Sequence, residues 1–566
     1  MLFRRKKKDA CVAFEEILLD ASNLPSFNRG RMEGRRELPI TIRNVGVVAA
    51  IFLLIAVWFF TKLFTLQIVN GQEYADISEN NSIDETTIIA ERGVVYDRNG
   101  ELLAWNEPDT EGIYSFPVRA YTDREGLGQL IGYVSYPLKD KRGFYYRTEY
   151  VGRNGVEASY NELLGGQNGE QFVETNALGE VIGEHVIDEP KPGKELTLSV
   201  DAKLSEAMYD IIASSTVRSG SRSGAAAIMD IHTGEIVAMT SYPSYDPEVM
   251  ADGDDVALIN EYNNDNRYPF LNKVLAGAYT PGSIVKPFVA YAALAEDIIS
   301  PNKIIVSTGE LVIPNPYNPS NPSIFRDWRA HGKMDMREAI AFSSNVYFYV
   351  ISGGFGDQDG LGITKLNQYF SNFGFGERTG IHLANEQMGT VPNPNWKKDL
   401  FDDDWRLGDT YFTSIGQYGW QVTPLQMLVA YGALANGGKF FVPHVEKDVV
   451  GEYREWELDP WALDIIHEGM HMTTNYPGGT ARSLEKPYVK IAAKSGTAEL
   501  DFAKARLNTW AAGFWPYEEP KYSFVVLMEY APYDNRLGGT GVMGEIVDWI
   551  YKNEPQYLGI EPEETE

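Results

Sequence analysis

The longest apolar stretch of the chain lies near its N-terminus and predicts a helix that spans a membrane. Residues 45–61 contain no charged side chain, and after Lys62 the apolar run continues to Val69. As a helix, about 25 residues reach about 37 Å, which exceeds the roughly 30 Å thickness of the hydrocarbon core of a bilayer. A buried core helix is the alternative, but soluble cores rarely need an unbroken apolar stretch of this length. We therefore expect a transmembrane anchor at 45–69.

Beyond this span, the apolar and polar positions predict strands at both ends of a long helical middle. After a polar linker at 70–90, apolar runs flank Asn99-Gly100 and Thr233-Gly234, which predicts two β-hairpins. Helical periodicity marks 284–295, 335–352, 362–373 and 422–436, and strand patterns return at 489–500, 508–515 and 522–530. Strands on both sides of a helical middle predict an α+β domain with one antiparallel sheet.

These patterns predict five segments. They are a basic segment (1–44), the anchor (45–69), a β-rich module (70–200), an α+β domain (201–556) and an acidic tail (557–566). The first segment holds ten basic and six acidic side chains, so the positive-inside rule places it in the cytoplasm and the rest of the chain outside. No small-residue cleavage site follows the span closely, which indicates an uncleaved single-pass anchor in the cytoplasmic membrane.

Charge and cysteine content narrow the classes of partner and cofactor. The net charge of −29 argues against a nucleic-acid partner, because phosphate binding needs a basic surface. The single cysteine, Cys11, precedes the span, so the exported part contains no thiol. The histidines show no metal-ligand spacing, and we interpret His331, His467 and His471 as ordinary surface or core residues. We expect neither a metal site nor a cofactor.

The first motif with candidate chemistry is Ser283-Ile-Val-Lys286. Pro281-Gly282 breaks the chain just before it, and an apolar helical run follows, so Ser283 is expected at the N-terminus of a helix. At a spacing of three residues, Ser283 and Lys286 face the same way. A lysine among apolar groups loses its proton more easily, and a neutral Lys286 could take the proton from Ser283.

The second motif is Ser343-Ser344-Asn345. Its first hydroxyl could relay a proton between Lys286 and a leaving amine, and the Asn345 amide could hold both the lysine and the substrate backbone.

The third motif, on a predicted strand, is Lys494-Ser495-Gly496-Thr497. A cation with two hydroxyls suits a substrate carboxylate, and Gly496 lets a substrate backbone lie alongside as an added strand. The N–H groups of Thr497 and Ser283 could together form an oxyanion hole.

The spacing Ser-x-x-Lys is weakly specific by itself. It also occurs at Ser300–Lys303 and Ser483–Lys486. Only the copy at 283 combines a preceding Pro-Gly with an apolar helix, and the Ser483 copy follows the second motif instead of preceding it. The order and context of the motifs therefore select Ser283.

Together the three motifs resemble the signature of penicillin-binding proteins and class A β-lactamases. Beyond the anchor, the chain resembles class B penicillin-binding proteins over nearly all of its length. Segments that carry this resemblance lie at 91–104, 155–166, 234–247, 415–426 and 478–481. The resemblance implies a β-rich pedestal of the dimerisation type, followed by a transpeptidase domain in which helices flank a five-stranded antiparallel sheet.

The activity that the resemblance implies is D,D-transpeptidation of peptidoglycan. A D-Ala-D-Ala stem peptide would acylate Ser283, an amine from a neighbouring stem would resolve the acyl-enzyme, and β-lactams would acylate the same serine. The stretch 405–426 is most similar to elongation-type members, whose partner is a SEDS-family glycosyltransferase in the membrane. Ser344 and Ser495 replace the family's usual Asp and Thr, and Tyr418 interrupts its usual Gly-Gln-Gly. Some relatives carry a zinc site that includes a cysteine, which the exported part of this chain lacks.

Other readings remain open. They are a septal, division-type transpeptidase, a D,D-carboxypeptidase, and a non-catalytic β-lactam-binding sensor or scaffold. A class A β-lactamase would need a Glu-x-x-x-Asn pattern between the second and third motifs to activate water. The pattern occurs instead at Glu157–Asn161, far upstream, so β-lactam hydrolysis should be slow.

Overall fold

The computed structural model describes residues 41–560, with the exception of several short gaps. The gaps are 73, 75–82, 111, 113, 140–144, 176–180, 316, 317, 319, 501–504 and 536. The predicted basic segment thus lies outside the described residues, apart from its last four.

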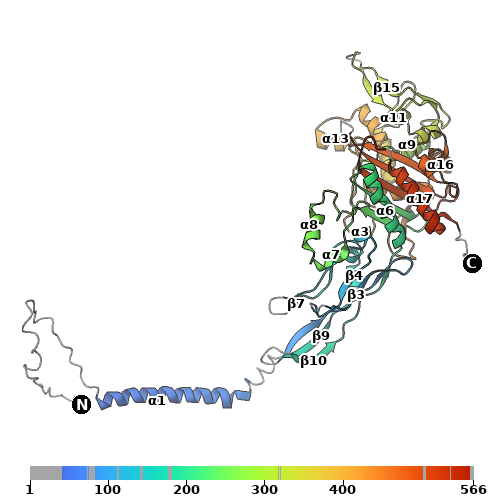
Figure 1. Cartoon of the computed structure of the whole chain (residues 1–566). Helices are drawn as coiled ribbons and strands as arrows, with labels where there is room; N and C mark the ends of the chain where they lie inside the picture. The colour runs from blue at the N-terminus through green and yellow to red at the C-terminus, as the bar shows by residue number, and fades with distance from the viewer. Residues whose placement is uncertain are drawn as a thin grey trace, which may run out of the picture. The chain divides into compact units, whose positions relative to one another are not determined.

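The predicted anchor is confirmed as a long apolar helix. Helix α1 (Ile42–Phe64) continues into the π-helical turn η3 (Thr65–Val69), so the helical stretch has 28 residues and begins three residues before the predicted start. None of its most apolar stretch is buried against protein, and by length and composition it can cross a membrane. It belongs to a different compact unit from the one that holds 85–173 and 181–566, and we describe each by itself (Figure 1).

The pedestal region contains two main sheets. One has the strand order β1 (Ile83–Ile88), β9 (Gly169–Thr175), β10 (Val181–Asp188). The other has the order β11 (Leu196–Thr197), β2 (Val95–Tyr96), β3 (Leu102–Glu107), β4 (Val118–Tyr121). The predicted hairpin at Asn99-Gly100 joins β2 to β3. The Asp97 carboxylate accepts the backbone N–H groups of Asn99 and Glu101, each at 2.8 Å, and Gly100 takes a φ of +84°.

Short helices and paired strands complete this region. They are α3 (Gly128–Ile131), α4 (Gly155–Ser159), α5 (Asn161–Leu164), β5 (Val134–Ser135) with β8 (Val151–Gly152), and β6 (Leu138–Lys139) with β7 (Tyr145–Arg147).

Five antiparallel strands form the central sheet of the C-terminal domain, as the family resemblance implies. Their order is β13 (Ile236–Tyr242), β12 (Ser223–Asp230), β22 (Tyr522–Pro532), β21 (Arg506–Trp515), β20 (Ala492–Glu499). The predicted hairpin at Thr233-Gly234 joins β12 to β13. Strand β20 lies at the edge of the sheet, so one side of its backbone has no neighbouring strand of this sheet.

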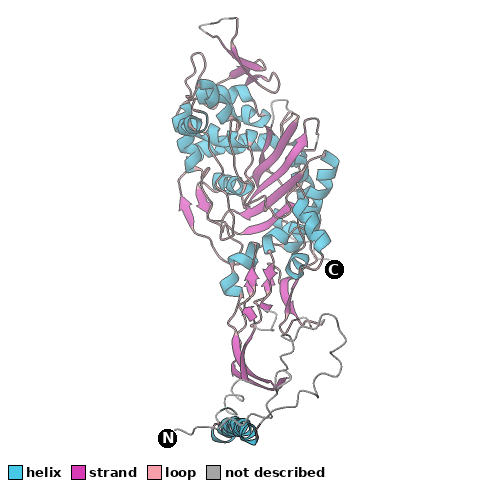
Figure 2. Cartoon of the chain, turned by 90° about the vertical axis from the view of Figure 1, so that its left-hand side faces the viewer, coloured by secondary structure: helices cyan, strands magenta, loops and turns pink. Residues whose placement is uncertain are grey.

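Helices cover both faces of this sheet (Figure 2). On one face, α6 (Ala202–Ser219) and α17 (Gly539–Asn553) pack against side chains such as Ala226 and Ile228. The alternate residues Ala227 and Met229 belong to the core of the other face, with α15 (Pro424–Ala435) and α16 (Pro460–Asn475). Because both faces are buried, β12 is a nearly continuous apolar run without an exposed face.

The helical middle departs from the prediction at one important place. The continuous helix predicted at 335–352 is wrong, because the structure has two helices, α10 (Met336–Phe342) and α11 (Asn345–Gly353). Ser343 ends α10 with a left-handed backbone, at a φ of +58°, and the Ser344 hydroxyl accepts the Tyr347 N–H to cap α11. Apolar periodicity continues across this break, so the pattern alone does not reveal it.

The remaining helices and strands surround this region. They are α7 (Pro247–Asp252), α8 (Val256–Asn264), α12 (Gly362–Asn372), α13 (Pro394–Phe401), α14 (Leu407–Ser414), the 3-10 turn η5 (Arg482–Leu484), β14 (Ile305–Ser307) with β17 (Gly332–Met334), β15 (Glu310–Ile313) with β16 (Ser323–Arg326), and β18 (Lys439–Phe441) with β19 (Tyr453–Glu455).

The predicted acidic tail starts too early. Tyr557 and Leu558, in the turn η6 (Pro555–Leu558), are buried in the core on the α6–α17 side of the sheet. The Tyr557 hydroxyl donates to Asp201 at 2.8 Å, and the Trp515 indole donates to the Tyr557 carbonyl, also at 2.8 Å. These apolar side chains therefore belong to the domain, and 561–566 lie outside the described residues.

Candidate active site

Ser283 lies in a tight turn directly before helix α9 (Lys286–Ala295). The turn is a short 3-10 helix, η4 (Gly282–Val285), in which Ser283 is half-buried and its neighbours Gly282, Ile284 and Val285 are buried. Gly282 has a φ of +60°, and a Cβ placed there would lie 2.6 Å from the Thr497 carbonyl oxygen. Glycine is therefore required before the serine, both for backbone conformation and for space.

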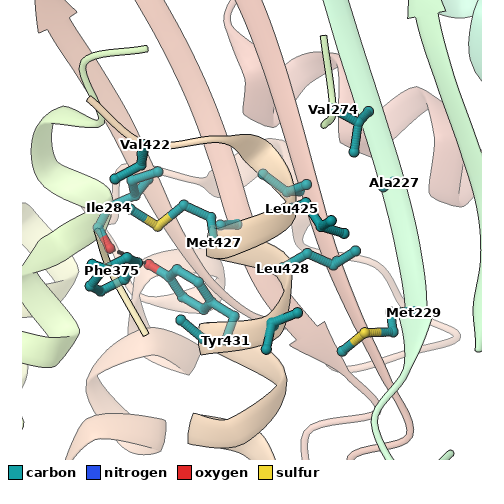
Figure 3. Close-up of a cluster of buried hydrophobic side chains, with 14 of the residues drawn as sticks. Ala227, Met229, Val274, Ile284, Phe375, Val422, Leu425, Met427, Leu428 and Tyr431 are labelled. Atoms are coloured by element: carbon teal, nitrogen blue, oxygen red, sulfur yellow. Dashed lines mark hydrogen bonds between the residues drawn. The ribbon is translucent and has the colours of Figure 1, made fainter. Parts of the chain in front are cut away.

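Hydrogen bonds from the core support the backbone of this turn. The Tyr431 hydroxyl, from α15, donates to the Ile284 carbonyl at 2.6 Å (Figure 3). The Trp510 indole donates to the Thr280 carbonyl at 3.0 Å, and the Gly282 N–H donates to the Gly416 carbonyl at 3.0 Å. Tyr431 and Trp510 are themselves buried, so their donor groups cannot bind water instead of these carbonyls. The hydrogen bonds therefore hold the turn in place.

Lys286 connects the first motif to the second. Its side chain is fully buried, and its ammonium donates to the Ser343 carbonyl (2.8 Å), the Ser343 hydroxyl (3.3 Å) and the Asn345 amide oxygen (2.8 Å). Among the described residues these are its hydrogen-bond acceptors, and the Ser283 hydroxyl is not one of them. Burial lowers the pKa of Lys286 to about 7, although the negative charge of Asp327 acts in the opposite direction.

The third motif lies against the turn that carries Ser283. A Cβ on Gly496 would lie 2.8 Å from the Ile284 side chain and 2.9 Å from the Pro281 carbonyl oxygen, so strand β20 passes very close to this turn. Thr497 is exposed on the same strand. The open edge of β20 therefore provides a backbone to which an extended peptide can add, next to the serine.

Lys494 is the second buried lysine of the site. Its ammonium donates to the Ser495 carbonyl at 2.9 Å, and the Ser495 hydroxyl donates to Thr480 at 2.6 Å. Burial, and then the nearby charge of Lys286, hold the pKa of Lys494 well below its usual range. Lys286 and Lys494 are close enough for their charges to interact, and two amines near each other favour an anionic ligand.

Asp327 is a residue of this region that the motifs did not indicate. It follows strand β16, and its carboxylate accepts hydrogen bonds from Ser344, Asn345 and Val346. Burial alone would raise the pKa of this carboxyl, but His331, the Asn345 N–H, the Ser344 hydroxyl and Lys286 outweigh it and hold the pKa well below its usual range. Asp327 and His331 are four residues apart, a spacing too common to indicate a site. Only the contacts with the second motif distinguish this aspartate from others.

In the described part of the chain, no group of three or more His, Cys, Asp or Glu side chains lies close enough to hold a metal ion. The Glu-x-x-x-Asn pattern at Glu157–Asn161 belongs to the pedestal. The Glu157 carboxylate binds Arg92 at 2.5 Å and Arg119 at 2.8 Å, and all three side chains are fully buried. The pattern therefore has a structural role in the pedestal.

Comparisons with known proteins identify two family domains in this chain. Residues 224–552 match the penicillin-binding protein transpeptidase domain, and residues 111–198 match the penicillin-binding protein dimerisation domain. A curated relative, the peptidoglycan D,D-transpeptidase MrdA of Haemophilus influenzae, is 29% identical across 90% of this chain and 91% of that protein. The match to the peptidoglycan D,D-transpeptidase FtsI of Escherichia coli is weaker, with 25% identity across 79% of this chain and 68% of that protein.

Solved structures of related proteins are similar to this chain over most of its length. The Pseudomonas aeruginosa PBP2 structure in complex with WCK 5153 has a TM-score of 0.68 and 29% identity, and the match covers 85% of this chain and all of that one. A chain from a peptidoglycan synthase complex that coordinates polymerization and crosslinking has a TM-score of 0.70 and 26% identity, across 92% of this chain and 99% of that one. Because one family domain alone covers more than half of its residues, the chain belongs to the penicillin-binding protein transpeptidase family.

Proposed function

We propose that this chain is a membrane-anchored peptidoglycan D,D-transpeptidase whose acyl-enzyme forms on Ser283. The observation that carries the proposal is the fully buried Lys286, which begins the helix after the Ser283 turn and binds Ser343 and Asn345 of the second motif. A lysine in this setting has a pKa near neutrality, which is what a general base for a serine hydroxyl needs. Family membership supports the same reaction.

In the proposed acylation, the Ser283 oxygen attacks the carbonyl carbon between the two D-Ala residues of a stem peptide. Neutral Lys286 takes the hydroxyl proton, and the N–H groups of Ser283 and Thr497 stabilise the oxyanion. The C–N bond then breaks, and Ser343 passes the proton to the departing D-Ala amine. In the second half, the amine of a neighbouring stem attacks the ester, releases Ser283 and completes the crosslink.

The third motif positions the donor peptide. Lys494 and the hydroxyls of Ser495 and Thr497 suit the terminal carboxylate of the donor, and the open edge of β20 suits its extended backbone. Asn345 holds Lys286 through its amide oxygen and has an amide N–H left for the substrate. A β-lactam presents the same carboxylate and a reactive amide, so it acylates the same serine.

The role in elongation, with a SEDS-family glycosyltransferase as partner, is the part of the proposal that rests most on relatives. The MrdA match is more extensive than the FtsI match. One structural relative comes from a complex that coordinates polymerization and crosslinking. The apolar helix supports a single membrane span, and the basic N-terminal segment supports a cytoplasmic N-terminus with the catalytic domain outside.

Acylation should depend on the titration of Lys286. Because burial lowers its pKa to about 7 and only the neutral amine accepts a proton, the acylation rate should rise through about pH 7 and level off above it. The measurement is the rate of labelling by a fluorescent penicillin between about pH 5 and pH 9. A rate that stays flat or falls across neutral pH would contradict the assignment of Lys286 as the base.

A product assay separates transpeptidation from the alternatives. The purified protein, kept in detergent, receives a donor that ends in D-Ala-D-Ala, with and without an amine acceptor. We expect D-Ala release together with an acceptor-linked product, and neither with Ser283→Ala. Release with water as the only effective acceptor would indicate a carboxypeptidase. Binding of penicillin without any D-Ala release would indicate a sensor or scaffold.

A further inference from the structure

A single buried carboxylate holds the backbone of the second motif. The Asp327 side chain has no exposed surface. Its Oδ2 accepts the Ser344 hydroxyl at 2.6 Å and the Val346 N–H at 3.0 Å, and its Oδ1 accepts the Asn345 N–H at 2.9 Å. Three consecutive residues that directly follow Ser343 therefore donate to the two oxygens of one side chain.

The Asp327 carboxylate also accepts hydrogen bonds from residues outside the second motif. Its Oδ2 accepts the Ser307 hydroxyl at 3.0 Å, and its Oδ1 accepts the Trp328 N–H at 2.9 Å. The His331 Nε2 lies 3.4 Å from Oδ1, and Arg329 donates to the other ring nitrogen of His331 at 3.3 Å. The 3.4 Å separation is an electrostatic contact, since Nε2 makes no hydrogen bond to a described residue. Both oxygens are thus fixed, and the carboxylate has little freedom to turn.

The segment 343–346, which Asp327 contacts, begins with a residue in a strained backbone conformation. Ser343 is a non-glycine residue with a φ of +58°, a conformation that costs free energy unless the surroundings enforce it. The carbonyl and hydroxyl of Ser343 and the amide of Asn345 are the oxygens that receive the Lys286 ammonium. The position of these oxygens depends on the backbone between them, which is where Asp327 binds.

An ordinary helix cap would not need this arrangement. Helix α11 already has a capping hydroxyl from Ser344, which accepts the Tyr347 N–H at 3.3 Å. Helix α10 begins with a capping box from Asp335 and Glu338, in which Asp335 accepts one backbone N–H. Asp327 comes from a distant loop, is buried, and binds the capping hydroxyl itself as well as two backbone donors.

We propose that Asp327 is a positioning residue of the active site: its carboxylate fixes the 343–346 turn so that Ser343 and Asn345 meet Lys286 in a reactive geometry. The inference rests on the proposed function of Lys286 as the base. A second effect follows from charge, since Asp327 raises the pKa of Lys286 against the effect of burial, and the charge of Lys286 in turn lowers the pKa of Lys494. Asp327 therefore affects both the place and the protonation of the base without touching the substrate.

The test is Asp327→Asn, assayed by fluorescent penicillin labelling across pH. An amide has only one acceptor oxygen, so its N–H groups would face other donors on one side, and the turn should shift. We expect the second-order acylation rate to fall by about 10²-fold, as is typical for a displacement of about 1 Å in an active site. We also expect the pH at which the rate rises to move lower, because the charge that raised the Lys286 pKa is gone.

Asp335→Asn is the matched control, since it removes a capping carboxylate near the same motif. It should keep both the wild-type rate and the wild-type pH profile. A reduced rate with an unchanged pH profile in a folded Asp327→Asn protein would overturn the proposal, because loss of a charge that acts on Lys286 must move the pH at which the rate rises. A wild-type rate would overturn it as well.

Two further variants keep the test decisive. If Asp327→Asn does not fold, Ser344→Ala replaces it, since this change removes one donor and leaves the charge. It should acylate several-fold more slowly with the wild-type pH profile, and a wild-type rate would overturn the inference. Ser283→Ala tests the proposed function separately. If that variant still labels, the proposed function fails; if it does not label but Asp327→Asn behaves as wild type, only the present inference fails.

Discussion

Replacement of Ser283 by alanine is expected to abolish covalent labelling by a fluorescent penicillin. Without the hydroxyl there is no oxygen to form the acyl bond, and loss of a serine nucleophile typically costs at least about 10⁴-fold in rate. Ser283 is half-buried in a turn held by its neighbours, so the smaller alanine should leave the fold intact. The measurement is in-gel fluorescence of the denatured protein after labelling.

The control is Ser300→Ala, because Ser300–Lys303 has the same Ser-x-x-Lys spacing. There Lys303 is exposed and donates to Gln358 at 2.7 Å, whereas Lys286 is fully buried. Ser300→Ala should label like the wild type. Label that persists on Ser283→Ala, with the protein folded, would move the nucleophile elsewhere and remove the basis of the proposed mechanism.

The second large effect concerns the stability of the pedestal. Glu157→Gln should lower the free energy of unfolding by about 3–5 kcal/mol, because it leaves two buried guanidinium groups, Arg92 and Arg119, without their carboxylate. Burial alone would raise the pKa of Glu157, but Arg119 and Arg92 outweigh it and lower the pKa. The stabilisation is therefore complete above the ordinary pKa of a glutamate and is lost as pH falls through the lowered value.

Thermal or denaturant unfolding, followed by circular dichroism, measures this loss. The matched control is Glu162→Gln, an exposed acid in the next short helix, which should change stability by no more than about 0.5 kcal/mol. Equal unfolding midpoints for the two variants would show that the buried ion pairs contribute nothing net. The ion pair Arg92–Glu157 also joins two segments, 91–104 and 155–166, that carry the family resemblance. This contact gives a physical reason why the two segments occur together.

Elements that depend on neighbours in the chain could be predicted from the sequence. The apolar run at 45–69 indicates its helix by length alone, and the hairpins at Asn99-Gly100 and Thr233-Gly234 follow from turn residues between alternating strands. The three short motifs each lie within four residues, so their spacing is visible in the linear chain. In each case the controlling interactions are local.

The features that could not be predicted depend on contacts between residues far apart in the chain. The break between α10 and α11 is invisible in the apolar pattern because it depends on a left-handed Ser343 and on Asp327, 17 residues before Ser344. Tyr557 and Leu558 join the core although they stand in an acidic context, and Asp201 and Trp515 bind Tyr557 there. The order of amino acids alone was enough to predict the anchor, the strand pattern and the candidate nucleophile. The burial of Lys286 and the carboxylate that holds its acceptors became known from the folded chain, because burial and charge act through space and not along the chain.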